Sequence, residues 1–344
     1  MILNDLKVIP KTDPSEIIRL RDSVYASDLF ITAVGHLNFF SWLASNPSTF
    51  NEILGKFSIK PRPTDVMLTL FKSLGLVVEK NEIFQVTDLV LDYLTDISGC
   101  NLIPYISTQT ERPIVDKMLE VLKMGKPASW GGKKDEKDWA TAMENEGFAG
   151  MFTAGMDSRG AYFAPGLAKS FDFSGYHSLI DIAGGSGIYA LAVKARFPAM
   201  RAALLEKPPV NRIAAKAWAK KGLGNDMEIF GLDMFESDIP KGFDIHLFSH
   251  VLHDWDEEQN KQLIANSYKN LNPRGVIMIY DAHLDRDKSG PLSVAEYSVL
   301  LMFSTYGKCY SIGEMEKMLS EQGFRNIKYR KAVGNRSIIT GQKI

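Results

Sequence analysis

The chain has 344 residues, 45% of them hydrophobic and 24% charged, and its 40 basic and 41 acidic side chains give a formal net charge of −1. This composition is typical of a globular protein, and the length predicts two domains. The balanced charge argues against nucleic acid or an anionic membrane surface as a standing partner.

The two cysteines, Cys100 and Cys309, are too few for a disulfide framework and lack the CxxC spacing of metal and redox sites. The first 22 residues carry early charges and no apolar signal segment, and no run of about 18 apolar residues follows. We therefore expect a cytoplasmic location and no membrane association.

Residues 14–100 predict helices and one hairpin. Helical spacing covers 37–44, 46–57 and 61–76, and two alternating runs within 77–87 surround Lys80-Asn81. Helix, helix and hairpin in this order indicate a winged helix. DNA binding would need a basic recognition helix, but 61–74 offers only Arg62 and Lys72, with Asp65 between them. Packing or dimerisation is the favoured role.

Residues 125–139 are rich in glycine and charge and predict a loop between the domains. We therefore place the domains at 1–125 and 126–344. Trp130 and Trp139 are unusual in a plain linker. They either pack the ends of the loop down or belong to a lid over a substrate.

From about residue 178, short apolar branched runs alternate with amphipathic segments. This alternation predicts the α/β class, with a doubly wound parallel sheet and helices on both of its faces. The last two runs flank Gly334-Asn335, which predicts a hairpin at the sheet edge.

The segment "LIDIAGGSGIYALAVKARF" reads as strand, glycine turn and helix. Gly184, Gly185 and Gly187 let the backbone turn sharply and approach a ligand, although the spacing also fits a dehydrogenase. Glu206 ends the next strand, where it can bind the two ribose hydroxyls of either NAD or S-adenosylmethionine. Asp233-Met234 follows the third strand, where an acid can hold an adenine amine while the methionine packs on the ring.

The motifs "DIAGGSG", "GLDMF", "HVLHDW" and "GKCYSIGEMEKMLSEQGF" together resemble the class I S-adenosylmethionine-dependent small-molecule O-methyltransferases, similar to plant caffeate and animal acetylserotonin enzymes. The resemblance covers nearly the whole chain. It implies a Rossmann-like sheet of seven strands, the last antiparallel, and an N-terminal winged-helix domain that forms a homodimer.

The resemblance also implies the residues that hold S-adenosylmethionine. They are Asp181, Gly184, Gly185, Gly187, Glu206, Asp233, Met234, Phe235 and Ser249. Two positions depart from the family pattern. Ala183 stands where the family usually has its first glycine, and Ser249 stands where plant members have lysine.

For catalysis, the resemblance implies that His253 is the general base and that Asp281 orients it. A histidine titrates near about 6.5, which suits removal of a proton from a hydroxyl. The second acid of the plant enzymes maps onto Cys309, which is either a wall residue or a nucleophile. His250 is interpreted as structural or cofactor-side, and we expect no metal, because no third ligand stands at matching spacing.

The acceptor is a small molecule, and the residues expected around it are Phe148, Phe152, Met156, Arg159, Tyr162, Trp130, Met302 and Cys309. Phe148, Phe152 and Met156 could equally be ordinary core residues of a helix. Arg159 either binds a carboxylate or makes a surface salt bridge. O-methylation is favoured. The alternatives are S-methylation of a small thioether acid, which needs no base, an NAD oxidoreductase, and a winged-helix regulator without catalysis.

Overall fold

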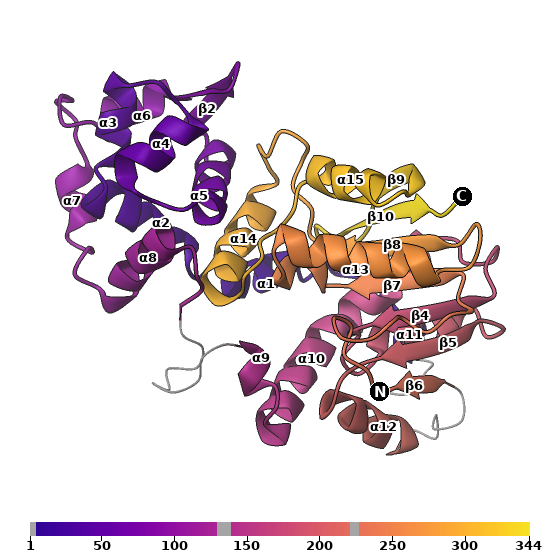
Figure 1. The fold of residues 1–344 in the computed structure, drawn as a ribbon. Coiled ribbons are helices and arrows are strands. Elements are labelled where there is room, and N and C mark those ends of the chain that lie inside the picture. Colours follow the sequence, from indigo (N-terminus) through magenta and orange to yellow (C-terminus); the bar gives the residue numbers. More distant parts are fainter. Residues whose placement is uncertain (1–4, 129–138, 221–226) are drawn as a thin grey trace. The chain divides into compact units, whose positions relative to one another are not determined.

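The computed structural model describes residues 5–128, 139–220 and 227–344 (Figure 1). The chain divides into two compact units by its internal contacts. Unit 1 contains residues 1–15, 130–283 and 312–344, and unit 2 contains 16–129 and 284–311. Residues 284–311 thus group with the N-terminal part of the chain, although the sequence places them inside the C-terminal part.

Within the described residues, unit 1 is built on a seven-stranded sheet of order β6-β5-β4-β7-β8-β10-β9. The strands are β4 (Ser178–Ile182), β5 (Arg201–Leu205), β6 (Glu228–Phe230), β7 (Ile245–Ser249), β8 (Val276–Asp281), β9 (Arg325–Lys331) and β10 (Ser337–Gln342). The other elements are η1 (Asp5–Lys7), α9 (Trp139–Ala142), α10 (Glu146–Ser170), α11 (Ile188–Arg196), α12 (Val210–Lys220), η4 (Leu252–Asp254), α13 (Glu257–Asn270) and α15 (Ile312–Glu321).

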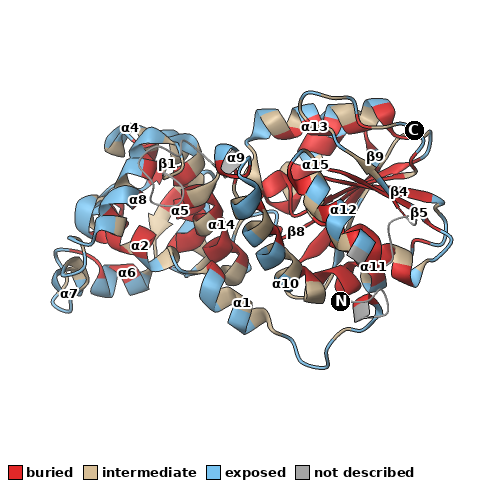
Figure 2. Cartoon of the chain, turned by 90° about the horizontal axis from the view of Figure 1, so that it is seen from below, coloured by how far each residue is buried: buried red, intermediate tan, exposed pale blue. Residues whose placement is uncertain are grey.

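Burial on both faces explains why the central strands are mostly apolar. Every residue of β4, β7 and β8 is buried, and the labelled strands β4 and β8 are red in Figure 2. Helix α10 contacts both α11 and α12, and α13 contacts α15, so the sheet is covered by two groups of helices (Figure 1). The predicted doubly wound α/β fold is confirmed.

The last strand runs against its neighbours. Strand β10 pairs antiparallel with both β8 and β9, whereas β6, β5, β4, β7 and β8 are parallel. Gly334 and Asn335 both have positive φ, and Arg336 N–H bonds Val333 O at 3.1 Å, so the predicted hairpin turn is present.

Unit 2 carries the predicted winged-helix pattern. Its elements are α2 (Ala26–Ile31), η2 (Thr32–His36), α3 (Phe39–Ser45), β1 (Ser48–Thr49), α4 (Phe50–Phe57), α5 (Pro61–Ser73), β2 (Val77–Lys80), β3 (Ile83–Val86), α6 (Asp88–Tyr93), α7 (Ile103–Ser107), α8 (Pro113–Met124) and α14 (Leu292–Ser304), with α1 (Ser15–Asp22) at its start. Thr49 and Glu52 form a capping box on α4. Gly75, with a φ of 69°, follows α5.

The basic residues of α5 are engaged inside unit 2. Arg62 donates to the carbonyl oxygens of Gly125, Met302, Thr305 and Gly307 at 2.8 to 3.1 Å. Lys72 bonds Glu79 at 2.7 Å and Asp287 O at 2.5 Å. These contacts hold α5 against α14 instead of presenting a cationic face to DNA.

Among the described residues, no helix combines the length and the apolar character that crossing a bilayer requires.

Candidate functional site: the carboxyl edge of the parallel sheet

The glycine loop connects β4 to α11 and leaves room beside its backbone. Gly185 and Gly187 have φ of 61° and 74°, and a Cβ on Gly185 would meet no atom within 4 Å. A Cβ on Gly184 would stand 2.4 Å from Asp181 Cγ, so only glycine fits there. Ala183 adopts a φ of 53°, a conformation that the family's usual glycine adopts without strain.

Two buried carboxylates frame this loop. Glu206 accepts hydrogen bonds from the backbone N–H groups of Gly185 and Lys207, both at 2.9 Å. Asp181 accepts from Ser249 Oγ at 3.0 Å. Burial raises the pKa of each carboxyl to about 7, and hydrogen bonds to the ionised forms only partly offset it.

The segment after β6 supplies the other predicted cofactor residues. Asp233 accepts the backbone N–H of Phe235 at 2.9 Å, and Lys207 Nζ lies 3.8 Å from the Asp233 carboxylate. Met234 is buried, and the Phe235 ring packs against Trp255 at 4.7 Å between centroids.

These groups fit S-adenosylmethionine by their chemistry. The open space at Gly185 admits a ligand, the Glu206 carboxylate accepts hydroxyl protons, and the apolar Met234 suits the face of a purine. All lie at the carboxyl edge of the parallel strands, where open α/β sheets bind their ligands.

His253 and Asp281 meet at the ends of neighbouring strands. His253 lies in η4 after β7, and Asp281 is the last residue of β8. His253 Nδ1 is 2.6 Å from Asp281 Oδ1, an oxygen that also accepts Ala282 N–H at 2.8 Å. Because a carboxylate accepts, the Nδ1 nitrogen carries a proton, and in the neutral ring Nε2 has the lone pair.

The surrounding charges favour the protonated form of His253. Burial by itself lowers its pKa, but Asp281 and Asp254 outweigh burial and raise it above 6.5. Asp254 Oδ1 lies 3.7 Å from His253 Nε2. Burial alone would raise the pKa of Asp281, yet the two histidines hold it well below its usual value. The side chains therefore form an imidazolium–carboxylate pair in mildly acidic solution.

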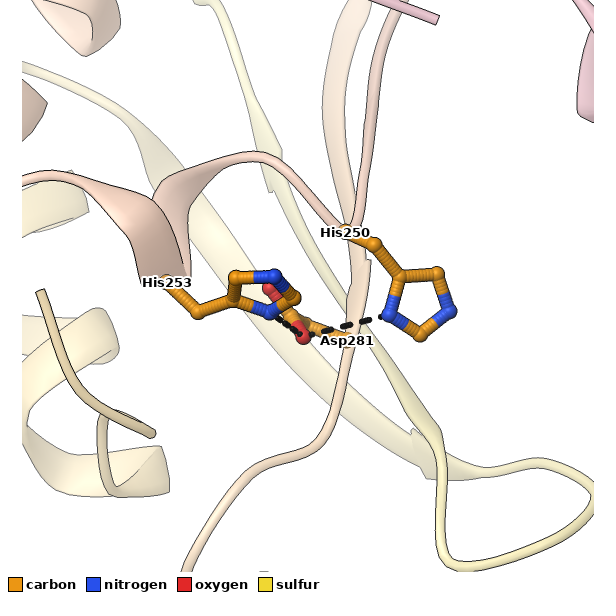
Figure 3. Close-up of side chains that lie close together, drawn as sticks. All are labelled: His250, His253 and Asp281. Atoms are coloured by element: carbon orange, nitrogen blue, oxygen red, sulfur yellow. Dashed lines mark hydrogen bonds and ion pairs between the residues drawn. The ribbon is translucent and has the colours of Figure 1, made fainter. Parts of the chain in front are cut away.

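His250 joins this pair (Figure 3). One ligand atom from each of His250, His253 and Asp281 lies within 4.8 Å of the others, so the cluster could hold a metal ion. Two ligands of one tetrahedral Zn²⁺ stand about 3.3 Å apart. The 2.6 Å separation in the His253–Asp281 pair is instead that of a direct hydrogen bond. Independence from metals stays a prediction, which full activity after dialysis against a chelator would support.

Helix α10 carries the residues predicted to contact the acceptor. Phe148 and Phe152 stack at 6.3 Å between centroids and pack against a buried cluster that includes Met143 and Val210. This contact gives the two rings a packing role, and their role as pocket lining stays a prediction. Met156, on the same helix, is half-buried.

Arg159, also on α10, is half-buried, and its Nε atom is buried. Its charge lowers the pKa of His250 and acts on His253. The guanidinium therefore lies within electrostatic reach of the His253–Asp281 pair, a position that a purely surface salt bridge does not require.

The remaining predicted acceptor residues come from both units. Tyr162 packs edge to face on Phe163, and burial and the Asp13 carboxylate raise the pKa of its phenol. Met302 and Cys309 are buried within unit 2, where Cys309 N–H donates to Ser298 Oγ at 3.1 Å. Trp130 lies outside the described residues. Their contribution to an acceptor site stays a prediction.

Two residues that the sequence did not single out hold the glycine loop. Asp157 of α10 accepts from Ser186 Oγ at 2.5 Å, and Trp218 of α12 donates to Ser186 O at 2.8 Å. A Cβ on Gly187 would stand 2.7 Å from Cζ2 of the Trp218 ring, so the tryptophan packs directly against the glycine. A buried tryptophan gives no pattern that points to a loop in advance, because its partner depends on how α12 packs.

Comparisons with known proteins agree with this geometry. Residues 122–325 match the family described as the O-methyltransferase domain. The chain is 26% identical over 320 residues to the 3-hydroxy-5-methyl-1-naphthoate 3-O-methyltransferase of Streptomyces sahachiroi, with 91% of each chain covered. A solved O-methyltransferase family 2 protein from Planctomyces limnophilus, in complex with apigenin, is 27% identical with a TM-score of 0.89, and the match covers 100% of both chains.

Human N-acetylserotonin methyltransferase in complex with S-adenosylmethionine shares the fold at 21% identity. The TM-score is 0.58, and the match covers 98% of this chain and 99% of the human one. The relatives are methyltransferases, which disfavours the NAD oxidoreductase alternative, and they favour oxygen over a thioether sulfur as the acceptor. The chain belongs to the O-methyltransferase domain family, and it is an S-adenosylmethionine-dependent enzyme that methylates a small molecule.

Proposed function

We propose that His253 is the general base that removes a proton from a hydroxyl group of the acceptor as the methyl group is transferred. The main support for this role is the 2.6 Å contact between His253 Nδ1 and Asp281 Oδ1. That contact fixes the ring and leaves the Nε2 lone pair of the neutral histidine for the acceptor proton.

The cofactor, when bound, supplies an electrophilic methyl group. The residues proposed to hold it are those around the glycine loop, with Glu206 accepting the ribose hydroxyls. The protein aligns the acceptor oxygen with the methyl carbon, and this proximity contributes much of the rate. His253 Nε2 takes the hydroxyl proton, and the Asp281 carboxylate stabilises the imidazolium that forms.

The test is a His253→Gln variant, which keeps polarity but cannot serve as a base. We expect kcat for O-methylation to fall by about two to four orders of magnitude, with unchanged S-adenosylmethionine affinity by calorimetry. His177→Gln, at an exposed histidine of unit 1, is the matched control and should retain wild-type activity. Near-wild-type kcat in the His253→Gln variant would show that the proton is removed in another way.

We further propose that the acceptor is a hydroxylated aromatic acid. The support is the position of the Arg159 charge within reach of His250 and His253. The Streptomyces sahachiroi relative is named for a hydroxynaphthoate, which carries both a hydroxyl and a carboxylate. A planar guanidinium binds a carboxylate through two hydrogen bonds, which lysine cannot reproduce.

Paired acceptors test this proposal directly. For an aromatic hydroxy acid, Arg159→Lys should raise KM by about tenfold or more, the loss of one charge-assisted hydrogen bond. For the corresponding phenol without the carboxylate, KM should stay unchanged. An equal effect on both acceptors would contradict carboxylate recognition by Arg159.

We also propose that the chain forms a homodimer through its N-terminal region and that it resides in the cytoplasm. Large apolar side chains of this region are exposed in the single chain, among them Leu20 at 76% and Ile97 at 91%. Burying such surface in a partner is favourable. Light scattering should give about twice the chain mass, and a Leu20→Asp variant should shift it toward the monomer.

A further inference from the structure

His250 holds an unusual backbone conformation immediately after β7. Its φ is 56°, in the left-handed region that residues other than glycine seldom adopt. Its backbone N–H donates to Tyr280 O at 2.9 Å. The ring packs against Phe163, Tyr189 and Tyr280 at 5.5 to 5.8 Å between centroids, so its orientation is fixed.

The fixed ring faces the catalytic carboxylate. His250 Nδ1 lies 3.5 Å from Asp281 Oδ1, the same oxygen that His253 Nδ1 contacts at 2.6 Å (Figure 3). The longer distance exceeds that of a well-formed hydrogen bond, so the contact is mainly electrostatic. Since the facing atom is a carboxylate oxygen, the proton of the neutral His250 ring belongs on Nδ1.

From these contacts we propose that His250 is a positioning residue that shares the Asp281 carboxylate with His253 and so weakens the hold of His253 on a proton. An N–H dipole directed at Asp281 Oδ1 draws on the negative charge that would otherwise stabilise the His253 imidazolium. His253 is then neutral, and able to act as a base, at a lower pH than with Asp281 alone. This assignment rests on the proposed role of His253 in catalysis.

Other groups act on His253, so the effect of His250 must be isolated. Besides His250, the charged or titratable groups are Asp281 of β8, Asp254 of η4, Arg159 of α10 and His283 after β8. Among these side chains, His250 is the one that faces the Asp281 oxygen that His253 contacts, and the Ala282 backbone N–H on the same oxygen is left in place by a change at position 250. A change at position 250 that leaves the other four in place therefore reports on this contact.

Three variants at position 250 separate the effect of the side-chain N–H from the effect of the backbone strain. His250→Asn tolerates the left-handed conformation and can place an amide N–H where Nδ1 stands. His250→Leu has nearly the shape of asparagine without the N–H. His250→Gly also lacks the N–H and removes the strain, so it serves if the leucine variant is unstable. Thermal melting and cofactor calorimetry check that each variant is folded.

The direct measurement is the NMR titration of the His253 ring, with His253→Gln used to assign its signal. We expect the midpoint to rise by about half a pH unit in His250→Leu and His250→Gly, a threefold gain in proton affinity, and to stay at the wild-type value in His250→Asn. Equal midpoints in the asparagine variant and both variants without the N–H would overturn the assignment.

The pH profile of kcat/KM separates this inference from the proposed function. If His253 is the base, the acid limb moves upward with the NMR midpoint. If the midpoint rises but the limb stays in place, His250 does tune His253 while the proposed base role of His253 fails.

Discussion

At the scale of single residues, the site depends on the sign of the charge next to His253. The pKa of His253 is raised above 6.5 because Asp281 and Asp254 outweigh burial. A base must be neutral to accept a proton, so kcat/KM should fall as the pH drops through a value above 6.5.

Replacing Asp281 should move this acid limb in the opposite direction from the changes at His250. Asp281→Asn removes the negative charge 2.6 Å from His253 Nδ1, so the imidazolium loses its stabilisation and the limb moves to lower pH. The maximal kcat should also fall, by about tenfold or more, because the ring is less well oriented. If the acid limb stays at the same pH while the maximal kcat falls, Asp281 orients the His253 ring without tuning its pKa.

The cofactor site should be sensitive to pH through Glu206. Burial raises the pKa of Glu206 to about 7, so the carboxylate form that we propose to accept the ribose hydroxyls is lost as the pH falls below that value. We expect S-adenosylmethionine affinity by calorimetry to fall up to about tenfold between pH 7.5 and 6.

Glu206→Gln is the control for this cofactor prediction. The variant should bind more weakly at pH 7.5 and show a flatter dependence on pH. Asp181, whose pKa is also raised to about 7, remains in that variant. If wild type and Glu206→Gln lose affinity in parallel as the pH falls, Asp181 or another group is responsible.

At the scale of elements, Arg62 ties together the ends of three segments of unit 2. It donates from the start of α5 to carbonyl oxygens after α8 and at the end of α14. Lysine keeps the charge, but its ammonium group lacks the planar, five-donor geometry with which the Arg62 guanidinium bonds four carbonyl oxygens. We expect Arg62→Lys to lower the free energy of unfolding by about 2 to 4 kcal/mol.

Urea denaturation would measure this loss, with Arg21→Lys as the matched control. Arg21 is largely exposed, and its guanidinium pairs with neighbouring Asp22 at 3.0 Å, so its variant should stay within about 0.5 kcal/mol of wild type. Equal stabilities for Arg62→Lys and Arg21→Lys would show that the four carbonyl contacts contribute little.

At the scale of the whole molecule, the domain boundary predicted at residue 126 separates residues 284–311 from the N-terminal residues with which they group by contacts. Helix α14 contacts α5 and α2, and most of its residues are buried within unit 2. A fragment of residues 126–344 would keep α14 but lose both partners and expose its apolar side chains. We expect this fragment to aggregate or to unfold without a cooperative transition by calorimetry.

A fragment of residues 16–129 should also be unstable, because it lacks α14. Adding the 284–311 segment as a peptide should raise its thermal stability, as a bound partner does for any folded state. Cooperative unfolding and full cofactor binding by the 126–344 fragment would contradict this view and support independent folding of the two sequence halves.

Much of the fold follows from local sequence. The alternation of buried runs and amphipathic segments predicts the parallel sheet, the residues around Gly334-Asn335 predict the edge hairpin, and the glycines after β4 predict the loop. These signals are local, because backbone conformation and side-chain burial repeat over a few residues. The predicted partnership of His253 with Asp281 came from family resemblance, and the structure places the two side chains 2.6 Å apart.

Only the tertiary structure decided which residues that are distant in the sequence contact the same atom or pack on the same segment. No local pattern directs His250 and His253 to the same oxygen of Asp281, puts Trp218 on the glycine loop, or groups residues 284–311 with the N-terminal helices. Such contacts depend on strand order and on how helices pack, which are set by burial across the whole chain. The sequence by itself determined the elements and the kind of chemistry, and packing decided which side chains meet to carry it out.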